Sequence, residues 1–288
     1  MTADRPFQAV PRPDAQRVGE IRMALDPRNA AAFPAFGEEA RASLAAACAA
    51  VARDEGGQAA DEAGRLIEAL RATAGALDPR ELTPRAGLMG LFDSRSGRLK
   101  RMREAFRAAD ARMSELTSDL GVQAQRLRGR VTDLDPALET LRAPIVELGA
   151  WIEAGRARLA DTADEAPEGE AAPRTVLSER LETLAAGRMA GLGHLPLARA
   201  LQNADAVAAE RLDQAVTALA AWRDDWKKAL GLDAKRPRRV QPDPAALAGF
   251  TARLSQAADR AQAMLADGRA RRARALAKLE ELRRALGD

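Results

Sequence analysis

Few residues in this chain have the chemistry of a catalyst. Cysteine and histidine, which commonly serve as nucleophile and general base, occur once each, as Cys48 and His194. A single histidine excludes a His–His metal site, and a single cysteine excludes a disulfide within the chain. Cys48 lies in an Ala-rich apolar run, which favours a small buried side chain over a reactive thiol. His194 follows Gly193 and precedes Pro196 by two residues, so we interpret it as a turn residue.

Other catalytic signatures are missing from the sequence. Gly191-x-Gly193 lacks the rest of a dinucleotide fingerprint, and no P-loop is present. Carboxylates are plentiful, but bases lie three or four residues from them, the usual pattern of a solvated helix face. We therefore expect no enzyme, no metal and no cofactor.

Three basic clusters are the main candidates for binding. We weigh ordinary solubilising charge against contact with an anionic surface, such as membrane lipid or nucleic acid. No aromatic residues interleave the bases, which argues against base stacking on single-stranded nucleic acid. The third cluster is expected to surround its helix as a solvated ring, because successive helical residues are 100° apart. The clusters are Arg98, Lys100, Arg101, Arg103 and Arg107; Lys235, Arg236, Arg238 and Arg239; and Arg269, Arg271, Arg272 and Arg274.

A pair of tryptophans offers a second type of contact. Trp222 and Trp226 lie four residues apart, and hence on one face of a helix. Core packing is the interpretation we favour, and a patch that docks a protein partner is the alternative.

Composition and periodicity predict the elements that carry these residues. The chain has 288 residues with 47% hydrophobic content, yet only 3% are aromatic. Ala, Leu, Arg and Glu form helices well, and no run of residues alternates in the manner of a strand. We predict an all-α protein, an elongated bundle of long, partly coiled-coil helices with a small N-terminal helical subdomain. With 45 basic and 42 acidic residues, the net charge of +3 does not by itself indicate a nucleic-acid partner.

Proline, glycine and charge patterns divide the chain into segments. Asp-Pro dipeptides at 26, 78, 135 and 243 predict helix starts, because Asp caps the first turn and Pro tolerates its first position. The predicted segments are a disordered N-terminus at 1–13, a short-helix subdomain at 14–92, a long helical arm at 93–160, an acidic linker at 161–173, and returning helices at 174–190, 196–231 and 243–286 that pack on the arm.

The long arm contains the clearest helical seam. Its apolar residues from Leu127 to Ile152 alternate spacings of four and three, as in a coiled coil. Pro136 and Pro144 each remove a helical hydrogen bond, so we expect a kink or break near residue 135. A further break is expected at Gly191–Leu195, with Pro196 opening the next helix.

The start of the chain and its hydropathy bear on localisation. The sequence from Met1 to Asp14 lacks the apolar core of a signal peptide, and no stretch approaches the roughly 20 apolar residues of a membrane span. One thiol fits a reducing compartment. We expect a cytoplasmic protein, with peripheral contact at the inner face of the membrane left open.

The order of several landmarks resembles the toxic anion resistance family, the TelA-like tellurite resistance proteins. The most specific landmark is the segment from Leu195 to Asn203, followed by Trp222-Arg223 and Ala229-Leu230. Leu25-Asp26-Pro27, the Gly-rich residues 87–92 and the tail from Arg271 to Leu286 also fit. Ala220 departs from the pattern, since the family tends to have proline two residues before the tryptophan.

The resemblance implies a role in withstanding tellurite and related stress without an established enzymatic mechanism. We therefore predict a non-enzymatic helical scaffold or adaptor that binds a protein partner, with self-association as an additional expectation. The alternative is a peripheral binder of an anionic surface through the basic clusters.

Overall fold

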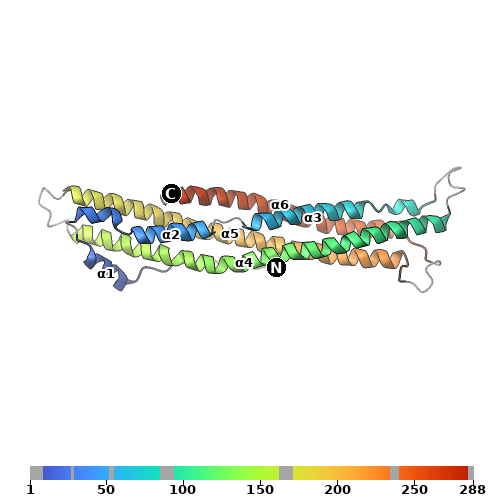
Figure 1. Ribbon diagram of the computed structural model, residues 1–288, viewed down its shortest axis with the longest axis horizontal. Helices are drawn as coiled ribbons and strands as arrows, with labels where there is room; N and C mark the ends of the chain where they lie inside the picture. The colour runs from blue at the N-terminus through green and yellow to red at the C-terminus, as the bar shows by residue number, and fades with distance from the viewer. Residues whose placement is uncertain are drawn as a thin grey trace. The chain divides into compact units, whose positions relative to one another are not determined.

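The computed structural model describes residues 9–26, 29–51, 55–84, 94–161, 171–233 and 240–284. Within these ranges the chain is helical and contains no strand, which confirms the all-α prediction (Figure 1). The elements are α1 (Ala15–Ala24), the 3₁₀ helix η1 (Ala30–Ala35), α2 (Glu38–Val51), α3 (Glu55–Gly75), the 3₁₀ helix η2 (Pro79–Leu82), α4 (Arg95–Asp161), α5 (Ala171–Ala229) and α6 (Pro244–Arg284).

The chain divides into two compact units, and the three longest helices each contribute to both. Unit 1 comprises residues 1–54, 131–203 and 271–288, whereas unit 2 comprises residues 55–130 and 204–270. Unit 1 therefore contains α1, η1 and α2 with one portion each of α4, α5 and α6. Unit 2 contains α3 and η2 with the remaining portions of the same three helices.

Each unit has its own hydrophobic core. In unit 1, Leu44 and Cys48 of α2 pack with a row of α4 residues that includes Leu141 and Ile145. In unit 2, Leu70 of α3 packs with apolar residues of α4, α5 and α6. Both cores follow from helix periodicity, because residues three or four apart share one face.

The structure divides the predicted N-terminal subdomain differently from the sequence analysis. The stripe on α2 contributes to the core of unit 1, and the stripe on α3 contributes to that of unit 2. The short helices of the predicted subdomain therefore contribute to separate cores. Each stripe packs with portions of the long helices.

Several predicted helix ends are confirmed by capping contacts. The side chain of Asp78 accepts a hydrogen bond from the Arg80 amide at the start of η2, and Asp243 accepts one from the Ala245 amide at the start of α6. At the end of α5, the amide of Leu232 donates to the Lys227 carbonyl and the amide of Gly231 to the Lys228 carbonyl. This double contact is a Schellman motif, in which Gly231 adopts a positive φ of 64°.

Of the kink or break that we expected near residue 135, the break is absent. Helix α4 runs without interruption through Pro136 and Pro144. A proline inside a helix costs about 3 kcal/mol, but burying one Leu or Ile side chain contributes about 1.5–3 kcal/mol. Leu138, Leu141 and Ile145 are at most 1% exposed, so packing of this face outweighs the cost of the prolines.

The predicted break at Gly191–Leu195 was also wrong, because α5 continues through this stretch and through Pro196. The glycines here permit close packing. A Cβ on Gly191 would lie 2.9 Å from both Leu44 methyl carbons, and one on Gly193 would lie 3.0 Å from a methyl carbon of Leu282. Their lack of a side chain lets other elements of unit 1 approach α5.

The coiled-coil seam faces the cores. Leu127, Leu134, Leu138 and the four apolar residues that follow at seam positions are buried, whereas Val131 is half-buried. Supercoiled packing of these residues stays a prediction, as does the elongated shape. Residues 162–170 of the predicted acidic linker and residues 1–8 of the N-terminus predicted to be disordered over 1–13 lie outside the described residues.

Candidate functional site

Cys48 and His194 both lie in unit 1 and both are buried. Cys48 is 0% exposed, and this burial raises the pKa of its thiol to about 12. His194 is 1% exposed, and its Nδ1–H donates to the Ala190 carbonyl oxygen at 2.9 Å. Burial lowers the pKa of His194, although the bond to Ala190 opposes this shift. His194 is therefore a helical core residue rather than a turn residue, and neither side chain is presented to a substrate.

The tryptophan pair belongs to the core of unit 2. Trp222 and Trp226 are 2% and 0% exposed, and both lie beside Phe106 of α4. The rings of Phe106 and Trp226 are stacked, with centroids 5.8 Å apart, and the Trp222 indole N–H donates to the Thr251 hydroxyl. This burial supports core packing and leaves the pair without a surface that could dock a partner.

The third basic cluster does not form the expected solvated ring. Arg272 is only 4% exposed, and Arg269 pairs with Asp61 of α3 at 3.4 Å. Arg271 and Arg274 are exposed. The expected ring assumed a helix with no packed wall, but α6 buries Gly268, Arg272 and Ala275 along one face.

The second basic cluster, Lys235, Arg236, Arg238 and Arg239, lies outside the described residues. Val240 directly follows it and is described. Its carbonyl oxygen accepts a hydrogen bond from Arg95 at 3.4 Å.

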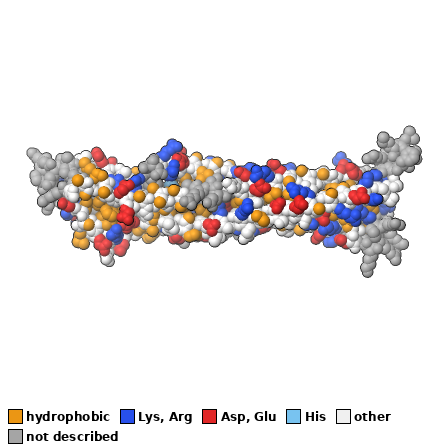
Figure 2. Space-filling model, in the orientation of Figure 1, with side chains coloured by type: hydrophobic (Ala, Val, Ile, Leu, Met, Phe, Trp, Pro, Cys, Tyr) orange, Lys and Arg blue, Asp and Glu red, His pale blue; other side chains and the backbone are white. Residues whose placement is uncertain are grey.

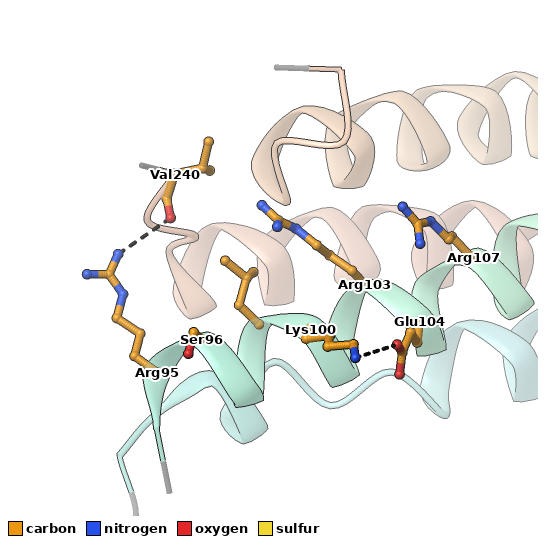
Figure 3. A pocket seen from close by; sticks show the side chains of 8 residues that line it. Arg95, Ser96, Lys100, Arg103, Glu104, Arg107 and Val240 are labelled. Carbon is orange, nitrogen blue, oxygen red and sulfur yellow. Dashed lines mark hydrogen bonds and ion pairs between the residues drawn. The ribbon is translucent and has the colours of Figure 1, made fainter. Parts of the chain in front are cut away.

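The first basic cluster borders a hollow of about 830 Å³ in unit 2, which we call the basic hollow. Most of its lining comes from the first four turns of α4 (Figure 3). Figure 2 shows Lys and Arg side chains gathered near the start of α4. The lining residues are Arg95, Ser96, Leu99, Lys100, Arg103, Glu104, Arg107 and Val240.

The lining of the basic hollow carries a surplus of positive charge. It has four cationic side chains and one carboxylate, Glu104. Lys100 and Glu104 are 4.0 Å apart, and both are well exposed, so their pairing is weak. Arg103 donates to the Leu230 carbonyl oxygen at 2.8 Å, which fixes its guanidinium at the end of α5. In Figure 3, Arg107 projects from α4 on the same side as Arg103.

Cations farther along these helices are neutralised, which sets the hollow apart. Asp110 accepts a 2.6 Å hydrogen bond from Arg223 and lies 3.4 Å from Lys227. Burial raises the pKa of Asp110, but these two cations outweigh it and lower the pKa overall. By contrast, Arg107 has no ion pair or hydrogen bond with any other residue that the structure describes.

The cations of the hollow also lie at the unfavourable end of their helix. A helix N-terminus carries partial positive charge and favours acidic residues, yet the first turn of α4 has none. Arg95 and Arg98 lie there instead, and Ser94 caps the Gly97 amide at 3.1 Å. The helix dipole and the side chains therefore add to one positive potential.

Sequence reasoning found part of this lining and missed the rest. Lys100, Arg103 and Arg107 were in the first cluster, whereas Arg95, Ser96 and Glu104 were not. The missed signal is spacing: residues 96, 100, 103 and 107 follow one another by four, three and four, and so share a helix face. Arg98, which the cluster included, is 8% exposed and donates to the Leu82 carbonyl oxygen.

The described residues offer neither a cluster of metal ligands nor a helix that could span a membrane. Among these residues, no group of three or more His, Cys, Asp or Glu side chains is arranged to hold a metal ion. No helix in the described part of the chain combines the length and apolarity needed to span a bilayer.

The segment that carries the most specific part of the resemblance forms a buried polar cluster in unit 1. Gln202 is 0% exposed, and its amide nitrogen donates to the Val131 carbonyl oxygen at 2.5 Å and to Asp135 at 3.0 Å. Arg199 also donates to Asp135, at 2.8 Å. This cluster links α5 to α4 at a fixed register.

A family model described as "Toxic anion resistance protein (TelA)" matches residues 18–238. The chain belongs to this family. The match spans more than half of the sequence and includes the Gln202 cluster and every lining residue of the basic hollow except Val240. Membership associates the protein with resistance to toxic anions such as tellurite. A search of curated proteins and a search of solved structures each found no match.

Proposed function

We propose that this member of the toxic anion resistance family works by binding, as a non-enzymatic helical scaffold or adaptor. The observation that carries the proposal is the burial of both Cys48 and His194. Thiol-based reduction or trapping of an oxyanion requires an accessible thiolate. A thiol with a pKa near 12 in an apolar core supplies almost none at neutral pH.

The adaptor role implies a protein partner, and the composition supports a cytoplasmic location. The described helices bury most of their large apolar side chains within the two units, and Met23, Val122, Val176 and Met189 are exposed exceptions. A partner would therefore meet a polar surface, where complementary charge sets specificity more than apolar area does.

The experiment that tests this proposal compares tellurite resistance of cells carrying the wild-type protein or Cys48→Ala. We expect equal resistance at equal protein level, because the thiol serves packing. In parallel, purified protein incubated with tellurite and a thiol reductant should reduce no more tellurite than buffer with the same reductant. Loss of resistance in the variant, or reduction by the protein, would contradict a non-enzymatic role.

A second candidate function is contact with an anionic partner through basic residues. The basic hollow favours it, because three more cations than carboxylates line one continuous surface. The third cluster gives it less support, since Arg272 is buried and Arg269 is paired. Binding that weakens steeply with added salt would support this candidate.

A further inference from the structure

The basic hollow has the geometry of a ligand site for a chain of anions. Its volume, about 830 Å³, falls within the range of small-molecule pockets, which is roughly 300–1,000 Å³. Lys100, Arg103 and Arg107 lie along one face, and successive cations are about one turn, or 5 Å, apart along the helix axis. Three cations spread over about 10 Å of helix match a chain of linked anions better than one small oxyanion.

The chemistry of the lining favours phosphate. Arginine presents a planar fork of donors that matches phosphate oxygens, and lysine adds a compact point charge. Ser96 contributes a hydroxyl one turn before Lys100. Leu99, which is 8% exposed, forms part of the wall beside these polar groups.

We propose that the basic hollow binds a ligand carrying several linked phosphate groups, held along α4 by Lys100, Arg103 and Arg107. This inference rests on the proposed function, since it assigns a ligand class to a protein that works by binding. Arg103 is already oriented by its bond to Leu230, so it loses less side-chain freedom when the ligand binds. Arg107 and Lys100 are exposed and supply the charge that the ligand neutralises.

The test is calorimetric titration of the full chain with tripolyphosphate at about 0.15 M salt, where charges beyond about 8 Å are screened. We expect wild-type protein to bind, and the double variant Lys100→Gln/Arg107→Gln to lose roughly ten- to hundredfold in affinity for each charged contact removed. Glu104→Gln should bind more tightly, because it removes the carboxylate from the lining. Both substituted cations are exposed, so the variants should fold as the wild type does.

Arg112→Gln is the matched control, because Arg112 is an exposed arginine on the same helix outside the hollow, paired with Glu115. It should leave the affinity unchanged. An equal loss in this control would overturn the site in favour of diffuse attraction. Inorganic phosphate should bind at least about tenfold more weakly than tripolyphosphate, since linked contacts reinforce one another. Equal affinity for the two would overturn the requirement for linked phosphates.

A vesicle arm separates free ligand from lipid headgroup. Phosphatidylserine vesicles should not retain the protein at this salt concentration. The contrary result has three parts: the vesicles retain the protein, only the variants of the basic hollow abolish this retention, and added tripolyphosphate does not reduce it. That result would identify the hollow as a membrane contact and would overturn the proposal. Absence of tripolyphosphate binding in wild-type protein also overturns it. Neither result bears on the Cys48→Ala resistance test, so the two proposals fail separately.

Discussion

The two units pack their long helices by opposite means. In unit 1, helical glycines lie where other side chains approach closely, and a Cβ on Gly155 would lie 2.6 Å from a methyl carbon of Leu181. In unit 2, Gly121, Gly129, Gly249 and Gly268 have no such atom within 4 Å of the corresponding position. The core of unit 2 contains three buried rings in mutual contact, Phe106, Trp222 and Trp226. The rings in the core of unit 1 are Phe33, Phe36 and the half-buried Trp151.

This difference shows how a chain with so few aromatic residues forms two cores. Small residues let backbones approach, so that Leu and Ile side chains fill the remaining space at normal density. Large rings fill a wider gap with fewer residues, and each buries more area. Removing a ring should therefore destabilise unit 2 more than unit 1, whereas adding a methyl group should destabilise unit 1 but not unit 2.

The largest effect is expected from Trp226→Ala in unit 2. Removing a buried tryptophan leaves a cavity and should cost about 3–5 kcal/mol in the free energy of unfolding. Trp151→Ala in unit 1 should cost less, because Trp151 is half-buried and packs edge-on against Phe36. Urea denaturation followed by far-UV circular dichroism measures both. Equal losses in the free energy of unfolding would contradict the proposed difference between the two cores.

Adding a methyl group should harm unit 1. Gly191→Ala places a Cβ 2.9 Å from the Leu44 methyl carbons and 3.1 Å from Ile145, so we expect a loss of about 1–3 kcal/mol from overpacking. In a Leu44→Ala background the same substitution should cost much less, since the colliding side chain is gone. If Gly191→Ala destabilises the Leu44→Ala protein as much as it destabilises the wild type, crowding by Leu44 is not the cause of the loss.

The same kind of substitution should help unit 2. Gly129 of α4 is exposed with no neighbouring atom within 4 Å, so Gly129→Ala should raise the free energy of unfolding by about 0.5–1 kcal/mol through helix propensity. Thermal denaturation of the variant should show a higher midpoint. A lower midpoint would mean that Gly129 has a packing role after all.

The smallest effect concerns the ion pairs that link helices. Hydrogen bonds from Arg41 and Arg180 lower the pKa of Glu38 in unit 1 to about 2. Glu38→Gln should cost less than about 1 kcal/mol at neutral pH, because the carboxylate is 42% exposed. Because the pKa of Glu38 is lower in the folded protein than its ordinary value of 4.5, ionised Glu38 stabilises the fold at pH values above 4.5. This stabilisation is lost as the pH falls from 4.5 to about 2.

Urea denaturation at several pH values should therefore show that the difference in the free energy of unfolding between wild type and Glu38→Gln becomes smaller below pH 4.5. Glu62→Gln in unit 2 serves as the control, since Glu62 pairs with Arg65 on its own helix. A pH-independent deficit would show that the lost contact is not ionic.

The helical class and the apolar faces were predictable from the sequence. Apolar residues from Leu127 to Ile152 follow one another at alternating spacings of four and three. This pattern predicts which helix face is buried, regardless of which element packs on it. The cap at Asp243 and the stop at Gly231 were predictable too, because local backbone requirements select those residue types. The family resemblance was confirmed for the same reason, since it depends on the order of residues along the chain.

Only the tertiary structure decided what proline, glycine and arginine do here. Pro136 and Pro196 stay within helices because packing outweighs their local cost, and Gly191 is a contact point because Leu44 lies against it. Arg272 is buried while Arg107 borders a hollow, although both belong to runs of similar sequence. The physical reason is that local propensities differ by at most a few kcal/mol, and contacts with residues distant in sequence exceed that difference.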